Sequence, residues 1–263
     1  MGFDITYHPI SVEQMTQWYF SKLLDVADGN IAALEKIGEE DHLKPFFMNE
    51  YIDTMRVASK VEENIAFEKL HVFYIAIVQG YFSPYYYTRG TAFSFLMDDK
   101  PQMKKYVTPW EQLKPDFIHS PVNGGLVENY SGGVYIAPEQ VVQLLDDYEK
   151  QEETRKIIDD FYVQNLPVFI KALQYAKENN LGLLEASEVV EPNPLDLNNS
   201  ESYSNLLNCD TEGALIYEKI ALKQLGRFIQ ESEKNKEQSN LSTKIKNGIQ
   251  NLLKKLPFGK NKE

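Results

Sequence analysis

The sequence has little cysteine and a deficit of basic residues. Its 263 residues include one cysteine, Cys209, which excludes an internal disulfide and favours a reducing cytosol. No Cys–His pattern surrounds Cys209, so a structural thiol is favoured over a nucleophile. The 27 lysines and arginines stand against 39 acidic residues, giving a formal net charge of −12. Such a chain is a poor ligand for nucleic acid, whose phosphates bind basic side chains, and it suits a basic protein partner.

Long apolar runs and signal-like segments are also lacking. The longest apolar run, residues 72–78, is far shorter than the about 18 residues that a transmembrane helix needs. The N-terminus carries Asp4 and no apolar core of a signal peptide. We therefore expect a cytoplasmic protein, in which the 43% of apolar residues form a globular core.

Motifs for metal binding, phosphate binding and nucleophilic catalysis are incomplete. Glu68 and His71 place a carboxylate and an imidazole on one helix face, but a di-iron site needs a second such motif and two more glutamates. His119 directly precedes Ser120, whereas the partners of a catalytic triad meet through the fold. The spacing of four glycines does not match a phosphate-binding motif, and tight turns are the favoured interpretation. They are Gly124, Gly125, Gly132 and Gly133. We predict no metal and no cofactor.

A strand-to-helix unit is present twice. In residues 123–148, a glycine-containing loop leads into the apolar strand 134–136, and Pro138 begins a helix. The N-terminus has the same order, with strand 5–7 followed by Pro9 and a helix. Each strand carries a tyrosine. The repeated order predicts that the two units pack as related parts of one core.

Helices dominate the rest of the predicted fold. Ser11 and Gln14 form a capping box, which begins a helix. Residues 65–78 are apolar nearly all round, which predicts a central buried helix. Pro167 kinks or splits a long helical pattern over residues 153–179. The fold class is therefore α+β and helix-dominated, with two strand-to-helix units packed on a central apolar helix.

A strand, a loop and a last helix are predicted before the tail. Residues 181–186 read as a strand, and residues 188–208, rich in Pro, Asn and Ser, as a long surface loop. Asp210 caps the helix that follows. The side chains of this helix that we expect to face inward are Leu215, Ile216, Ile220, Leu222, Leu225 and Ile229.

Composition divides the chain into an acidic body and a basic tail. Residues 1–230 are predicted to form one acidic globular domain, 231–240 a polar linker and 241–263 a basic amphipathic helix. Three alternatives remain for the surface on which the apolar stripe of this helix packs: the acidic body of its own chain, a partner's groove and an anionic membrane surface. The predicted contact residues of the tail are Lys244, Ile245, Ile249, Leu252, Leu253, Lys254, Lys255 and Leu256.

The order of parts resembles a family of small bacterial proteins, the YfbM type. The likeness rests on Met1-Gly2, on residues 134–141 with the glycines before them, and on the run 169–184. It covers residues 1–190, whereas the long helical insert and the C-terminal region depart from the family pattern. The resemblance implies a fold and no activity.

The candidate binding residues come mainly from the aromatic segment 81–96. Tyrosine offers a large contact area with a polar tip, and arginine can bind a carboxylate or phosphate through two hydrogen bonds. Three consecutive tyrosines cannot all point inward in a regular element, so at least one is expected to be exposed. The alternative is a core element that packs against the preceding helix. The candidate partner-binding residues are Tyr85, Tyr86, Tyr87, Arg89, His119 and Tyr135.

These features favour a non-enzymatic bacterial binding protein. We expect an acidic inhibitor of the immunity type that holds a basic protein partner such as a toxin, because acidic charge steers association with basic partners. One alternative is a hydrolase or transferase of small molecules, with a site between the two strand-to-helix units that uses His119, Arg89 and Tyr135. Another is a membrane-surface accessory protein held by its tail.

Overall fold

A computed structural model describes residues 3–60 and 62–231 of the chain. The chain divides into two compact units, Met1–Glu218 and Lys219–Glu263. The first unit combines a mixed sheet with many helices, which confirms the predicted α+β, helix-dominated fold. The predicted linker after residue 231 and the amphipathic tail, 241–263, lie outside the described residues.

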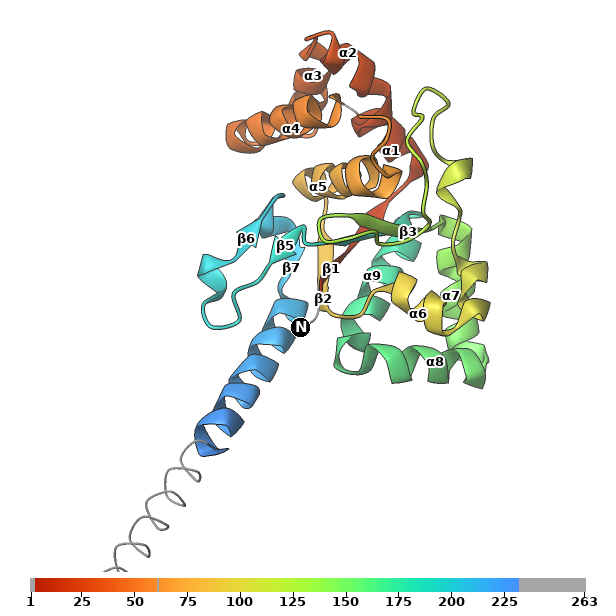
Figure 1. The fold of residues 1–263 in the computed structure, drawn as a ribbon, viewed down its shortest axis with the longest axis vertical. Helices are drawn as coiled ribbons and strands as arrows, with labels where there is room; N and C mark the ends of the chain where they lie inside the picture. Colours follow the sequence, from red (N-terminus) through yellow and green to blue (C-terminus); the bar gives the residue numbers. More distant parts are fainter. Residues whose placement is uncertain (1–2, 61, 232–263) are drawn as a thin grey trace, which may run out of the picture. The chain divides into compact units, whose positions relative to one another are not determined.

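A five-stranded sheet with the order β3-β4-β1-β2-β7 lies at the centre of the first unit (Figure 1). Strand β4 pairs antiparallel with both β1 and β3, so these two strands run parallel to each other on either side of it. Both strand-to-helix units therefore contribute to one sheet, and β4 fills the space between them. The strands are β1 (Asp4–Ile10), β2 (Tyr85–Arg89), β3 (Gly132–Ile136), β4 (Gly182–Ser187) and β7 (Cys209–Asp210).

Helices cover both faces of this sheet, because alternate side chains of its buried strands point to opposite sides. Tyr7 and Ile136 belong to the apolar cluster on one face, and Ile10 and Tyr135 to the cluster on the other. The first face is covered by α6 (Phe93–Asp99), α7 (Pro138–Lys150), α8 (Glu152–Tyr162) and α9 (Leu166–Glu178). The second is covered by α1 (Val12–Trp18), α2 (Leu23–Ala27), α3 (Ala32–Glu40), α4 (Pro45–Ala58) and α5 (Phe73–Phe82).

The predicted capping box begins α1. The Ser11 hydroxyl oxygen accepts the Gln14 N–H at 3.1 Å, and the Gln14 side-chain oxygen accepts the Ser11 N–H at 2.9 Å. Two N–H groups that would otherwise lack partners at the helix start are thereby bonded.

We expect Ser11→Ala to lower the free energy of unfolding by about 1 kcal/mol, because the Gln14 N–H loses its acceptor. Urea denaturation of both proteins measures the difference. Ser11→Asp, which keeps an acceptor at this position, should retain most of the stability. Equal losses in the alanine and aspartate variants would contradict a capping role.

The central apolar helix and the split at Pro167 are both confirmed. Helix α5 is nearly entirely buried, and a π-helix, Glu68–Val72, runs directly into it. Pro167 lies in the first turn of α9, where its missing N–H costs no helical hydrogen bond. A short turn separates α8 from α9, and in it Val163 adopts a left-handed φ of 48°.

The C-terminal part of the first unit differs from the prediction at two points. The predicted strand 181–186 is β4, but the predicted loop 188–208 contains a second, two-stranded sheet of β5 (Val190–Glu191) and β6 (Glu201–Ser202). Asp210 caps the helix 211–231 as predicted, since its carboxylate accepts the Glu212 N–H at 3.0 Å.

The inward orientation predicted for the helix 211–231 is wrong for most of its apolar residues. Ile216 and Tyr217, which belong to the first unit, pack on its apolar clusters. The side chains predicted to be buried that are instead exposed are Leu215, Leu222, Leu225 and Ile229. Nowhere in residues 3–60 and 62–231 is there a helix long and apolar enough to cross a membrane.

Candidate functional site

The three consecutive tyrosines of β2 are all buried. Tyr85, Tyr86 and Tyr87 are 0%, 4% and 0% exposed, so the expectation that at least one is exposed is wrong. Tyr86 points to the α9 side, where its ring lies 6.1 Å from that of Tyr175. Tyr85 points the other way and stacks on His8 at 4.9 Å. Alternation does separate the rings, but both faces of this strand are covered, and neither faces solvent.

Arg89 is engaged inside the molecule. Its guanidinium forms an ion pair with Asp4 and lies over the ring of Tyr217, 4.8 Å from the centroid. Asp4 is also the acceptor of the Tyr87 hydroxyl at 2.5 Å. Burial, together with the Asp4 charge, raises the pKa of Tyr87 far above its usual value. This cluster fastens β1 to β2 and to the start of the last helix.

Tyr135 and His119 lie apart from these residues. Tyr135 is fully buried on β3, with β4 and β1 between it and β2, and its hydroxyl donates to the Ile10 carbonyl at 3.0 Å. His119 is exposed in the loop before β3. The six predicted partner-binding residues therefore do not form one surface. The tyrosines on β2 and β3 belong to the core, whereas Arg89 is partly exposed.

The glycine loop holds an anion from its own chain. The N–H groups of Asn123 and Gly124 both donate to one carboxylate oxygen of Glu68, at 2.7 and 2.5 Å. Gly124 has a φ of 84°, a conformation that glycine adopts readily and that turns successive N–H groups toward one acceptor. The tight-turn interpretation is confirmed here, with an internal carboxylate in the position of a bound anion.

Glu68 and His71 are both fully buried on the π-helix. The Nδ1 atom of His71 lies 2.9 Å from the Tyr19 hydroxyl, while Glu68 holds the glycine loop. In the part of the chain that the structure describes, no three His, Cys, Asp or Glu side chains are arranged to hold a metal ion.

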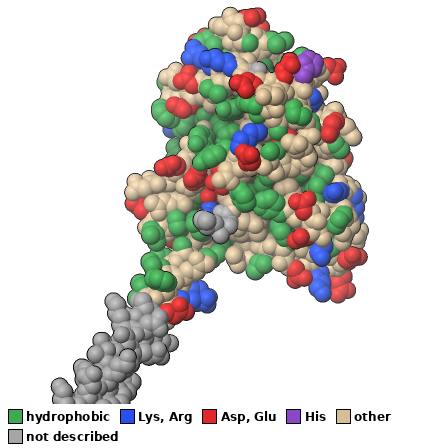
Figure 2. Space-filling model, in the orientation of Figure 1, with side chains coloured by type: hydrophobic (Ala, Val, Ile, Leu, Met, Phe, Trp, Pro, Cys, Tyr) green, Lys and Arg blue, Asp and Glu red, His purple; other side chains and the backbone are tan. Residues whose placement is uncertain are grey.

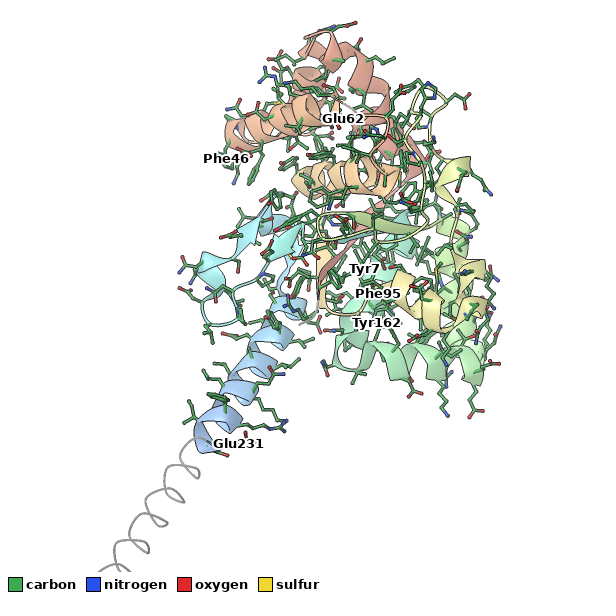
Figure 3. All side chains as sticks on the ribbon, viewed as in Figure 1. Tyr7, Phe46, Glu62, Phe95, Tyr162 and Glu231 are labelled. Atoms are coloured by element: carbon green, nitrogen blue, oxygen red, sulfur yellow. The ribbon has the colours of Figure 1, made fainter. Side chains whose placement is uncertain are left out.

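Glu185 is a buried carboxyl group in the middle of β4. It accepts hydrogen bonds from the Ser94 hydroxyl at 2.5 Å and the Ser94 N–H at 3.2 Å. Burial raises its pKa to about 7 despite these donors. Tyr7 and Tyr162, which lie on the same side of the sheet in Figure 3, share a hydrogen bond of 2.8 Å nearby. This site is closed inside the core, with Glu185 only 1% exposed.

An exposed aromatic cluster lies elsewhere, near the small β5–β6 sheet. Tyr130 and Tyr203 are 39% and 54% exposed, and their rings meet edge to face with centroids 5.8 Å apart. Both rings rest on buried Phe73, at 6.2 and 6.0 Å. Half-buried Tyr74 also contacts Phe73, with ring centroids 5.7 Å apart. We call Tyr74, Tyr130, Tyr203 and Glu191 the Tyr130 patch.

Two glutamates lie near Tyr130 in the patch. The Tyr130 hydroxyl donates to Glu191 at 3.1 Å, and this bond with the Glu191 charge raises the pKa of Tyr130. Glu188 lies close enough to contribute to the same shift. Tyr130 has a left-handed φ of 58°, a conformation that costs a non-glycine residue energy and occurs often at binding sites. Figure 2 shows hydrophobic, acidic and basic side chains intermixed on one face of the molecule.

Sequence reasoning missed this patch, because its members come from three distant segments. Tyr130 stands in the polar-aromatic loop before β3, and Tyr203 lies in the region read as a structureless loop. The one available signal was Tyr203, an isolated tyrosine in a segment rich in Pro, Asn and Ser. The composition of this segment resembles that of many protein-binding loops.

Comparison with known proteins gives no relatives. No family model, no curated protein and no solved structure matches this chain. The resemblance to the YfbM type therefore stays a prediction.

Proposed function

We propose that this chain is a non-enzymatic binding protein of the bacterial cytoplasm that holds a basic protein partner on the Tyr130 patch. The patch is the observation that carries the proposal, since two exposed tyrosines pack on buried Phe73 near Glu188 and Glu191. Exposed tyrosines with a fixed orientation are frequent centres of binding energy in protein interfaces.

Charge supports a basic partner. The chain has a formal net charge of −12, which accelerates diffusion of a basic protein toward it. Lysine or arginine side chains of such a partner can lie on the tyrosine rings and pair with the glutamates. An inhibitor that neutralises a basic toxin, in the manner of an immunity protein, has these properties.

The test uses a partner captured on the immobilised full-length chain and then purified. We expect Tyr130→Ala with Tyr203→Ala to weaken its binding by at least tenfold, because centrally placed tyrosines carry much of the energy of such interfaces. Calorimetric titration at low and physiological salt measures the affinity, and the association rate should fall as salt rises.

Phe46→Ala is the matched control. Phe46 is 64% exposed at the outer end of α4, as Figure 3 shows, and lies outside the patch. Its loss should leave the affinity unchanged, and all variants should keep the wild-type melting temperature within a few degrees. Equal affinities of the wild type and the double variant would refute the Tyr130 patch as the interface.

A further inference from the structure

The π-helix Glu68–Val72 places two titratable side chains in the interior. Such helices are rare and occur often at functional sites, because the extra residue per turn turns side chains out of the usual helical positions. Here both Glu68 and His71 are fully buried, although only one oxygen of Glu68 and one nitrogen of His71 are bonded. The binding proposed for the Tyr130 patch uses neither residue.

Three buried polar atoms in this region have no hydrogen-bond partner among the described residues. They are Glu68 Oε2, His71 Nε2 and Ser120 Oγ. Hydrogen bonds also link the segments that carry these atoms: the Phe67 N–H donates to the Pro121 carbonyl at 2.8 Å, and Lys114 Nζ donates to the Ser120 carbonyl at 3.1 Å. Folded proteins rarely leave such atoms unbonded, so a group of this kind calls for a ligand or a water molecule.

His71 also forms part of the wall of a cavity of about 160 Å³. Its apolar lining comes from two segments: Leu23, Leu24 and Ala27 from α2, and Phe117 with Ile118 from the loop before β3. Its polar lining is Ser59, Glu63, His71 and His119. A cavity of about this volume with apolar walls takes up one six-membered ring. Because Leu24 and Ala27 are exposed, the cavity opens to solvent beside α2.

The charges at the cavity favour a neutral ligand with one polar group. Burial, with the nearby Lys114, lowers the pKa of His71 to about 4, so the ring is neutral at pH 7. Glu63 at the cavity repels anions, and Lys114, whose charge also lowers the pKa of His71, disfavours a cation beside that ring. A hydroxyl group both donates and accepts, so it can bond to Nε2 in either tautomer of the histidine.

We infer that this cavity is a binding site for a small, neutral, single-ring alcohol or phenol. The ring lies between α2 and the residues 117–118, and the hydroxyl hydrogen-bonds to Nε2 of His71. The site is separate from the Tyr130 patch, and its occupation does not depend on a protein partner.

The test is titration of the full chain with phenol, followed by isothermal calorimetry and amide chemical shifts. We expect saturable binding with shifts centred on α2, the π-helix and residues 117–119. Benzene, which has the same ring without the hydroxyl, should bind about tenfold more weakly because it leaves Nε2 unbonded. Equal affinities for phenol and benzene would overturn the role of His71.

Ala27→Phe provides the variant that closes the cavity. Ala27 is exposed at the end of α2, so the larger side chain can cover the opening without entering the core. We expect an unchanged melting temperature and loss of phenol binding. Phenol binding that persists in a folded Ala27→Phe protein, or that never saturates in the wild type, would show that the cavity is not the site.

Discussion

Replacing Tyr87 with alanine is expected to lower the free energy of unfolding by about 3–5 kcal/mol, the range for removing a buried aromatic ring. The ring is fully buried in the cluster with Tyr85 and Val190, and its hydroxyl is bonded to Asp4. The substitution therefore opens a cavity and leaves a buried carboxylate with one donor fewer. Urea denaturation followed by circular dichroism measures the change.

Two further variants separate the causes of this loss. Tyr87→Phe keeps the ring and removes only the hydrogen bond to Asp4, so it should cost about 1–3 kcal/mol. Tyr203→Ala removes an exposed tyrosine and should change stability by less than about 1 kcal/mol. A Tyr87→Ala protein as stable as the wild type would show that β2 is not part of the core in solution.

Glu185→Gln is expected to change how stability depends on pH. Burial raises the pKa of Glu185 in the folded protein to about 7, from a usual value of 4.5. Between these pH values the folded state keeps a proton that the unfolded chain has released. The contribution of this proton to the free energy of unfolding is fully present below pH 4.5. It is lost as the pH rises through 7, and the total loss is roughly 3 kcal/mol.

Buried histidines act in the opposite direction. Burial lowers the pKa of His71 to about 4 and that of His8 to about 3, so unfolded histidines bind protons that the folded ones do not, and stability falls below pH 6.5. Tyr7 and Tyr162 stay neutral throughout this range, since the usual pKa of a tyrosine is near 10 and burial raises the pKa of each further. The contribution of Glu185 is therefore visible in the difference between the wild type and the glutamine variant.

Urea denaturation from pH 4.5 to pH 8 measures that difference. The wild type should lose stability relative to Glu185→Gln as the pH rises, since glutamine has no proton to release. Glu178→Gln, at an exposed position near the end of α9, should run parallel to the wild type. A constant difference between the wild type and Glu185→Gln would contradict a carboxyl group that is protonated near neutral pH in the folded state.

The sequence by itself determined the local features of this protein. The capping box at Ser11, the split at Pro167 and the cap at Asp210 all follow from interactions between residues a few positions apart. Hydrophobic periodicity also identified the central helix, because a helix that is apolar all round must be buried.

Only the tertiary structure decided which side chains are exposed and which polar groups meet. Alternation along β2 separates its tyrosines, but burial on both faces depends on α9 and on the cluster around Tyr217, which no local pattern reveals. Pairing of Glu68 with the glycine loop, and of Tyr130 with Tyr203, joins segments far apart in the chain. Such contacts arise from the packing of the whole core, whereas sequence periodicity reports only on the nearest turns and strands.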